Sequence, residues 1–313
     1  MDAVARDEGA VPVLIGEEAT WAEPEGGERS LPGARLSTLK ILTGLEAGRI
    51  HALVGHETVI GRGAQCDWTI DDRALSRRHC RVFRSGDTFV IEDLGSRNGT
   101  HVDGAAISFA VPLRDGAIIQ LTEDVIVRFS TQDEVEVEAD QRLYESSVLD
   151  ALTGAYNRRH MDQRLGAELA FATRHQSPFS VLLLDIDLFR GLNDVMGRAA
   201  GDVALRALAA RLQRSVRAED VVVRTAGGEF AVIARGIPAS GAWLLAERIR
   251  QTTAAMRVPH EGTTLSFTIS VGVVTMGRER PFPTVEALLE AADQALSRAK
   301  ADGRNRCSVA QLR

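Results

Sequence analysis

Residues 179–187 read FSVLLLDID, and residues 219–235 read EDVVVRTAGGEFAVIAR. The first stretch is an apolar run that leads directly into Asp185 and Asp187, which is typical of a buried strand with carboxylates at its end. The second holds two short apolar runs separated by small residues, the pattern of a β-hairpin with Glu229 beside its tip. Acids at neighbouring strand ends predict a site for a hard cation, which takes oxygen ligands and often bridges to phosphates.

The hairpin segment 224–230, RTAGGEF, resembles the signature of the GGDEF family, Arg-Tyr-Gly-Gly-Asp/Glu-Glu-Phe. Members of that family condense two GTP molecules into cyclic di-GMP. A second segment, DALTGAYNRR at 150–159, resembles the opening motif of the same family, and the match covers about residues 150–310. The resemblance implies an α+β domain in which helices cover an antiparallel sheet, as in nucleotide cyclases and polymerase palms.

The resemblance also implies roles for individual residues. In the family each GTP lies on one protomer of a dimer, and Mg²⁺ or Mn²⁺ neutralises the charge that develops during phosphoryl transfer. By position, Asp185 and the carbonyl group of Ile186 would hold the metal. The positions that would bind GTP are Arg190, which stands where the family usually has lysine, together with Asn193, Asp202, Lys300 and Arg304.

Gly228 stands where the family signature has its first acid. Cations held against a triphosphate need anionic ligands, and Asp185 alone supplies one; losing a charge-stabilising group costs on the order of a hundredfold in rate. Ala226 replaces the first glycine and could strain a turn that prefers positive φ. Glu229 could take the vacant place as a catalytic acid if the hairpin shifts by one residue. We expect cyclase activity to be impaired or absent.

A second nucleotide site is also implied by the resemblance. Arg217 and Asp220 form Arg-x-x-Asp at the family's offset before the hairpin, and Arg248 falls on the family's secondary arginine. In GGDEF proteins these positions bind a cyclic di-GMP dimer and inhibit the enzyme. Arginine forks suit phosphate oxygens and guanine edges. A surface ion pair is the alternative interpretation of the same residues.

Residues 36–130 carry short apolar segments separated by turn residues, which predicts an all-β sandwich. Three polar motifs lie between these segments: GR at 61–62, SRRH at 76–79 and NGT at 98–100. Their order resembles a forkhead-associated (FHA) domain, a family that binds phosphothreonine peptides. The resemblance implies that Arg62, Ser76 and Arg77 meet the phosphate and the residues beside it, and that Asn98 bonds the peptide backbone. A polar loop surface without a ligand is the alternative.

These observations divide the chain into a disordered acidic tail (1–35), an FHA domain (36–130), a connector helix (131–149) and a GGDEF domain (150–313). The tail holds eight acids against three arginines, and Thr20 within it is a candidate for phosphorylation. In the connector, Val137, Tyr144 and Val148 recur at helical spacing. The pattern suits an amphipathic helix, a coiled coil or a solvated single helix.

The net charge of −6 gives no electrostatic reason to expect nucleic-acid binding. No apolar run reaches the length of a membrane span, and the N-terminus lacks a secretory pattern, so we expect a cytoplasmic protein. The expected partners are a phosphothreonine protein, GTP or cyclic di-GMP, and a second copy of the chain. Three functions remain open: a nucleotide-binding effector with impaired cyclase activity, an active, product-inhibited diguanylate cyclase, and an FHA scaffold with vestigial nucleotide sites.

Overall fold

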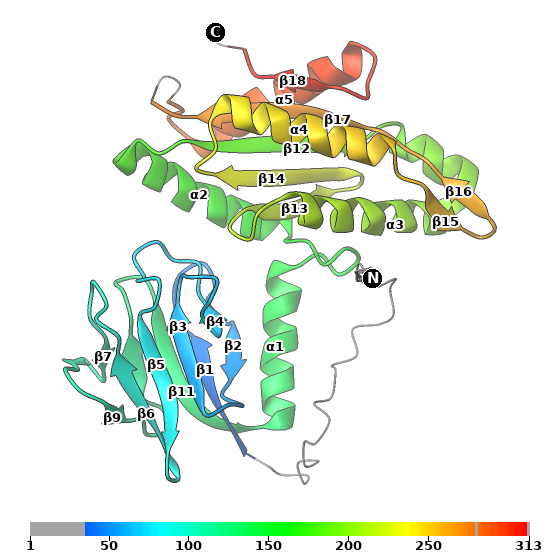
Figure 1. Ribbon diagram of the computed structural model, residues 1–313. Helices are drawn as coiled ribbons and strands as arrows, with labels where there is room; N and C mark the ends of the chain where they lie inside the picture. The colour runs from blue at the N-terminus through cyan, green and yellow to red at the C-terminus, as the bar shows by residue number, and fades with distance from the viewer. Residues whose placement is uncertain (1–34, 279–280, 312–313) are drawn as a thin grey trace, which may run out of the picture. The chain divides into compact units, whose positions relative to one another are not determined.

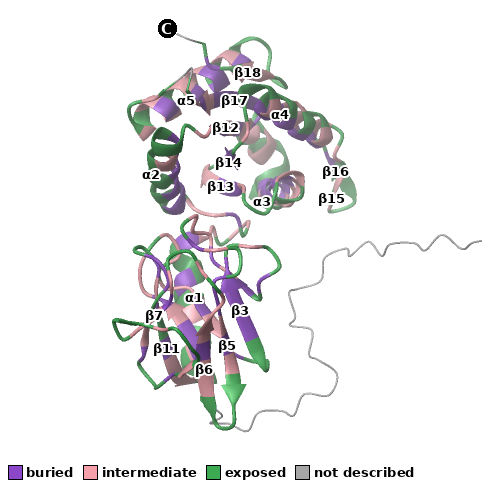
Figure 2. Cartoon of the chain, turned by 60° about the vertical axis from the view of Figure 1, so that its left-hand side comes forward, coloured by how far each residue is buried: buried purple, intermediate pink, exposed green. Residues whose placement is uncertain are grey.

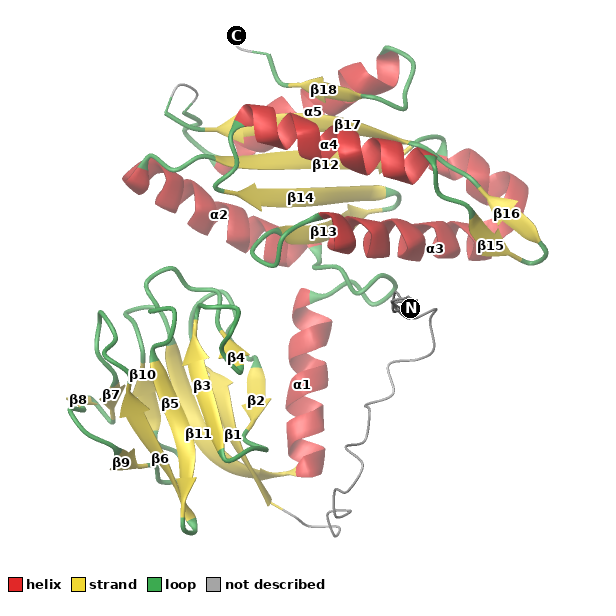
Figure 3. Ribbon diagram, viewed as in Figure 1, coloured by secondary structure: helices red, strands yellow, loops and turns green. Residues whose placement is uncertain are grey.

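The first half of the chain folds into two packed β-sheets (Figure 3). The computed structural model describes residues 35–278 and 281–311, so the expected acidic tail and Thr20 lie outside the described residues, apart from Arg35. One sheet has the order β2-β1-β11-β10-β7-β8. Its strands are β1 (Arg35–Ile41), β2 (Ile50–Ala52), β7 (His101–Val102), β8 (Ala105–Ala106), β10 (Ile118–Gln120) and β11 (Ile126–Asp133). The other has the order β4-β3-β5-β6-β9. Its strands are β3 (Glu57–Gly61), β4 (Trp68–Thr69), β5 (Cys80–Ser85), β6 (Thr88–Asp93) and β9 (Val111–Pro112).

The inner faces of these two sheets share one core. Leu39 and Val127 from the first sheet are buried with Ile60 and Ile91 from the second, and Trp68 is 2% exposed. Alternate residues of each strand face this core, which is the arrangement of a β-sandwich. The predicted all-β sandwich is confirmed.

The connector forms helix α1 (Glu134–Val148). Its N-terminus carries a capping box: the Asp133 carboxylate accepts from the backbone amide of Glu136, and the Glu136 carboxylate accepts from the backbone amide of Asp133. Tyr144 and Val148 are buried, and α1 contacts β1, β2 and β11. The apolar stripe therefore packs on the N-terminal sheet, as an amphipathic helix does.

The second half is built on one five-stranded sheet of order β13-β14-β12-β17-β18 (Figure 1). Its strands are β12 (Phe179–Ile186), β13 (Val221–Ala226), β14 (Glu229–Arg235), β17 (Ile269–Met276) and β18 (Cys307–Val309). Strands β15 (Val258–His260) and β16 (Thr263–Leu265) form a separate small hairpin. The α+β architecture is confirmed, but β18 runs parallel to β17, so the sheet is mixed and not wholly antiparallel as expected.

Four helices cover the two faces of this sheet. Figure 2 shows α2 (Arg158–His175) and α5 (Val285–Ala301) on one side, and α3 (Phe189–Ser215) and α4 (Ala239–Ala254) on the other. Helix α3 is interrupted at Gly197, where φ is 84°. That conformation suits glycine and permits a sharp bend. No helix in the described ranges is long and apolar enough to cross a bilayer.

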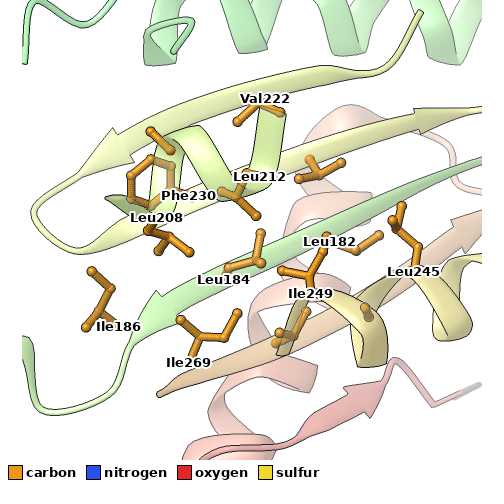
Figure 4. Packing of buried hydrophobic residues seen from close by; sticks show 14 of the residues in the cluster. Leu182, Leu184, Ile186, Leu208, Leu212, Val222, Phe230, Leu245, Ile249 and Ile269 are labelled. Atoms are coloured by element: carbon orange, nitrogen blue, oxygen red, sulfur yellow. The ribbon is translucent and has the colours of Figure 1, made fainter. Parts of the chain in front are cut away.

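Strand β12 is buried on both faces, which explains its unbroken apolar sequence. Leu182, Leu184 and Ile186 face α3 and α4, where they pack with Leu208 and Ile249 (Figure 4). The intervening residues face α2 and α5. Strand β12 is thus held in the middle of the domain, and its C-terminal end is fixed where Asp185 emerges.

Helix α5 lies unusually close to the sheet. A Cβ atom at Gly272 of β17 would overlap the backbone of Ala292 and Leu296. Ala292, Leu296 and Ala299 are themselves buried. This close packing fixes the last turn of α5, which carries Lys300, against the sheet.

Candidate functional site

Asp185 and Lys300 form the centre of the predicted nucleotide site. Asp185 lies near the end of β12, and the Nζ atom of Lys300 lies 2.7 Å from its Oδ2 atom. The two side chains are 21% and 34% exposed. Partial burial strengthens such an ion pair relative to one in open solvent. The carboxylate that the sequence assigns to a metal therefore already has a cation.

Asp187, the second acid after the apolar run, has a structural role. One of its carboxylate oxygens accepts from Ser270 Oγ at 2.6 Å, and the other accepts from Thr268 Oγ1 at 2.6 Å and the Asn305 amide at 2.9 Å. These bonds join the end of β12 to the start of β17 and to the loop after α5. Asp187 thus positions neighbouring segments.

The hairpin tip between β13 and β14 consists of Gly227 and Gly228. The positive φ of 48° falls on Gly227, whereas Ala226 is outside the left-handed region, so the expected strain at Ala226 is wrong. Gly228 is buried, and its carbonyl oxygen accepts from the Ile186 amide at 3.1 Å. A Cβ atom there would lie 3.0 Å from the ring of Phe189. The Phe189 ring covers the position where an acidic side chain would begin.

Glu229 is in direct register with Asp185 across β14 and β12, while the β13–β14 pairing of the hairpin shifts by one residue between Arg224 and Ala226. Its side chain lines a cavity of about 270 Å³ together with Arg158, Glu290 and Asp293. Because residues in register on adjacent strands share one face of the sheet, Glu229 is the cross-strand neighbour of Asp185, which is paired with Lys300.

The residues around Asp185 do not fit a divalent metal ion. Position 228 has no side chain, Asp187 accepts three hydrogen bonds within the chain, and Asp185 is paired with an ammonium group, which leaves Glu229 as the neighbouring acid. Mg²⁺ and Mn²⁺ prefer several oxygen ligands, usually including carboxylates. Within the described ranges no three side chains of His, Cys, Asp or Glu are grouped so that they could hold a metal ion.

The other predicted GTP contacts are distributed around this centre. The bend at Gly197 folds Asn193 back onto the second part of α3, where a Cβ atom at Gly201 would overlap its amide oxygen. Asn193 thus lies against Gly201, the residue that precedes Asp202. Arg190 and Arg304 are exposed. Arg304 has a φ of 61°, and its amide donates to the Ala299 carbonyl at 3.0 Å.

The predicted second site lies at the other end of the β13–β14 hairpin. Arg217 and Arg248 are both exposed, and Arg248 donates to the carbonyl of Ser215 at the end of α3. Asp220 accepts from the backbone amides of Arg217 and Arg235, each at 3.0 Å. Both arginines are available to a ligand, whereas Asp220 also braces the turn before β13 and the end of β14.

The loops of the β-sandwich bring the predicted phosphopeptide residues together. Arg62 donates through Nε to the Leu75 carbonyl at 2.8 Å, and Ser76 Oγ accepts from the Arg97 amide at 3.0 Å. Asn98 donates to the Ala74 carbonyl at 2.9 Å. Arg77 is exposed on the same loop as Ser76.

Two buried residues hold these loops in place. A Cβ atom at Gly61 would lie 2.9 Å from the Ser76 carbonyl oxygen, so only glycine permits this approach. Burial lowers the pKa of His79, which is fully buried. Its neutral ring accepts from the Ser76 amide at 3.3 Å, which leaves Nε2 as the donor to the Gly99 carbonyl at 3.2 Å.

The opening motif at 150–159 is tied to the hairpin. Arg224 donates to both carboxylate oxygens of Asp150, at 3.0 and 3.1 Å, and Thr153 Oγ1 donates at 2.7 Å. Partial burial opposes the charge on Asp150, but the bonds from Thr153 and Arg224 outweigh it and lower the pKa of this carboxyl group. The two family motifs thus form one hydrogen-bonded unit.

Sequence reasoning missed an ionic cluster that we name the loop cluster. Its members are Asp71 and Arg73 of the β4–β5 loop, Arg164 and Glu168 of α2, and Arg235 at the end of β14. Glu168 lies 2.7 Å from Arg235, 2.8 Å from Arg73 and 3.1 Å from Arg164.

Within the loop cluster, Asp71 pairs with both Arg164 and Arg235. Burial opposes the charge on Asp71, but the two guanidinium groups outweigh it and hold its pKa below the usual value. No short-range sequence signal could reveal these pairs, because their members lie 93 and 164 positions apart.

Comparison with protein-family models gives two matches. A model described as "Diguanylate cyclase, GGDEF domain" matches residues 147–306, and a model of the FHA domain matches residues 58–122. The first match covers α2 to α5 and the strands among them, including Asp185, the hairpin and Lys300. The second covers the strands and loops that carry Arg62, Ser76 and Asn98.

Curated relatives match the second half of the chain. "Probable diguanylate cyclase DgcC" of Escherichia coli (strain K12) is 38% identical over 173 residues, 55% of this chain and 46% of the relative. "Response regulator PleD" of Caulobacter vibrioides (strain NA1000 / CB15N) is 42% identical over 163 residues, 51% of this chain and 36% of the relative. The chain thus spans less than half the length of either relative.

Solved structures agree with this assignment. The coiled coil and GGDEF domain of DgcB from Caulobacter crescentus, in complex with c-di-GMP, gives a TM-score of 0.53 at 28% identity over 56% of this chain and 93% of that one. Diguanylate cyclase SiaD of Pseudomonas aeruginosa, in complex with its activator SiaC, gives 0.51 at 32% identity over 56% and 67%.

Proposed function

Since this chain belongs to the GGDEF diguanylate cyclase family and also carries an FHA domain, we propose that it couples phosphothreonine recognition to nucleotide binding, with impaired cyclase activity. In this proposal, the FHA domain (36–130) recognises a phosphothreonine protein, and the GGDEF domain (150–313) binds cyclic di-GMP or GTP. Residues 131–149 form the helix that connects the two domains. The chain acts as a homodimer in the cytoplasm.

The coupling proposal rests on one observation: the β4–β5 loop contributes residues to the proposed phosphopeptide site and also contacts the GGDEF domain. Ser76 and Arg77 at one end of this loop belong to the proposed phosphopeptide site. Asp71, five positions before Ser76, pairs with Arg164 and Arg235 of the GGDEF domain. A phosphate that draws Ser76 and Arg77 toward itself would alter the geometry of Asp71, because the loop is short and hydrogen-bonded along its length.

The loop cluster extends this connection toward the proposed cyclic di-GMP site. The backbone amide of Arg235 donates to Asp220, and Asp220 also accepts from the amide of Arg217. Arg235 therefore touches Asp71 through its side chain and the Arg-x-x-Asp turn through its backbone. This continuous set of contacts supports the effector role, because a displacement at either end would be felt at the other.

The impaired activity rests on the nucleotide site. Asp185 is paired with Lys300, and Gly228 contributes no carboxylate. A group that stabilises transition-state charge is commonly worth about 3 kcal/mol of barrier or more. An active, product-inhibited cyclase is the second candidate, because Asn193 lies against Gly201, the residue before Asp202, and both Asn193 and Asp202 are guanine-binding positions by resemblance.

The phosphopeptide assignment predicts that Arg62→Ala reduces affinity for a phosphothreonine peptide library by at least about thirtyfold, since a charge-assisted phosphate contact is lost. Fluorescence anisotropy on full-length protein measures this. Arg84→Ala is the matched control, because Arg84 lies at the far end of β5 from Ser76. If wild type and Arg62→Ala bind the phosphorylated peptides equally well, and neither binds the unphosphorylated peptides, the role of Arg62 is refuted.

The effector assignment predicts that Arg217→Ala weakens cyclic di-GMP binding by at least about tenfold, because a guanidinium contact to phosphate or guanine is removed. Isothermal titration calorimetry on protein freed of bound nucleotide provides the measurement. Arg174→Ala, an exposed arginine on α2, is the control. A wild-type protein that binds no cyclic di-GMP would exclude the effector role and leave the scaffold hypothesis.

A further inference from the structure

We propose that the site at Asp185 binds the triphosphate of GTP without a divalent cation, because Lys300 occupies the place that a metal ion would take. This inference rests on the proposed nucleotide-binding function and specifies how its GTP site works. It concerns binding alone and requires no chemical step.

The position of Lys300 is fixed by the fold. Helix α5 approaches β17 so closely that Gly272 cannot carry a side chain, and Ala299, the residue before Lys300, is buried. The Nζ atom of Lys300 lies 2.7 Å from Asp185 Oδ2, the distance of a charge-assisted hydrogen bond. The ammonium group is therefore held at the carboxylate by the helix that carries it.

A divalent ion at Asp185 would have to displace this ammonium group. Asp187 accepts three hydrogen bonds from Thr268, Ser270 and Asn305, which leaves little capacity for a metal. The Phe189 ring covers Gly228, where the family signature has an acid. A Mg²⁺ ion at Asp185 would have Glu229, the cross-strand neighbour, as a second carboxylate but none from position 228, and it would lie beside the positive charge of Lys300, which Coulomb repulsion disfavours.

The charges around the site bear on its ligand. Asp185, Asp187 and Glu229 each contribute one negative charge, and Lys300, Arg190 and Arg304 contribute three positive charges. The loop that carries Arg304 is tied to the end of β12, because the amide of the next residue, Asn305, donates to Asp187 at 2.9 Å. A further acid at position 228 would have to be offset by added cations before the site could accept a triphosphate, whereas here the three positive charges already balance the three carboxylates.

The composition of the chain permits a direct test. Lys300 and Lys40 are the only lysines in the sequence. Lys40 lies on β1 and pairs with Asp140 of α1 at 2.9 Å. Full-length protein with ¹³Cε-labelled lysine therefore gives two side-chain NMR signals, assigned by Lys40→Ala, and Lys40 is an internal control. The ligand is α,β-methylene GTP, which cannot be cyclised.

We expect the analogue to bind with similar affinity in excess EDTA and in excess Mg²⁺, within about threefold, as measured by calorimetry. In EDTA it should shift the Lys300 signal and leave the Lys40 signal unchanged, whereas Mg²⁺ alone should shift neither. Lys300→Ala should weaken binding in EDTA by at least about tenfold, while Lys40→Ala should not.

Three results would overturn the inference. Binding more than about tenfold weaker in EDTA than in Mg²⁺ would show a metal-dependent site. A Lys300 shift caused by Mg²⁺ alone would show that the metal displaces the lysine. Absence of analogue binding in both buffers would refute it as well, while cyclic di-GMP binding, tested separately through Arg217, would still decide the effector function.

Discussion

Gly228→Glu is expected to raise the rate of cyclic di-GMP formation by roughly a hundredfold over wild type, because it supplies the second carboxylate that the family signature places beside Asp185. The backbone at Gly228 does not have a positive φ, so a glutamate is compatible with the turn. Its Cβ atom would meet the Phe189 ring at 3.0 Å, and a ring movement of a few tenths of an ångström would accommodate it.

The measurement is the appearance of cyclic di-GMP by chromatography, with GTP and Mg²⁺ or Mn²⁺, after removal of bound cyclic di-GMP. Gly166→Glu adds the same charge at an exposed position of α2 with open space around it, and it should stay at the wild-type rate. Turnover by wild type equal to that of Gly228→Glu would establish the active-cyclase hypothesis instead. Failure of both proteins would show that Gly228 is not what limits the rate.

Glu168→Ala is expected to destabilise the GGDEF domain by about 3–5 kcal/mol, the usual cost of leaving buried charges without their partner. The Glu168 side chain is 4% exposed, and it faces three arginines of the loop cluster. Its removal leaves Arg164 and Arg235, which are 4% and 8% exposed, sharing only Asp71.

Because a chain with two cores can unfold in more than one transition, hydrogen exchange of the α2 and β14 amides is a better measurement than a single melting curve. Protection should fall in these elements in Glu168→Ala. Glu138→Ala removes an exposed partner of Arg142 on α1, and it should change protection by less than about 0.5 kcal/mol. Unchanged exchange in Glu168→Ala would mean that water or another group compensates the arginines.

The sequence was sufficient to predict the parts of the fold in which local pattern and packing agree. The β12 run and the hairpin are recognisable because strands buried on both faces are continuously apolar. The first part of α3 is not predictable from periodicity, because its polar sequence, with Val195 and Met196 exposed, has no buried stripe. Periodicity revealed the apolar face of α1 but could not identify the sheet that covers it.

The candidate sites show a similar division. Motif spacing selected Asp185, Gly228 and Lys300, but only the fold shows that Lys300 and Asp185 are paired. The sequence pattern also predicts that Asp187 and Asp220 bind ligands. In the structure, each of these carboxylates accepts several hydrogen bonds within the chain. A sequence pattern identifies which carboxylates are present, but it does not show which are already satisfied by neighbours.

The β4–β5 loop has a thermodynamic consequence. If phosphothreonine binding at Ser76 changes the affinity for cyclic di-GMP through Asp71 and Arg235, then cyclic di-GMP must change the affinity for the phosphoprotein by the same factor. Each ligand therefore changes the affinity of the protein for the other through the same contacts. A cell could use such a protein to release or retain a phosphorylated partner according to its second-messenger level, and no turnover of nucleotide would be needed.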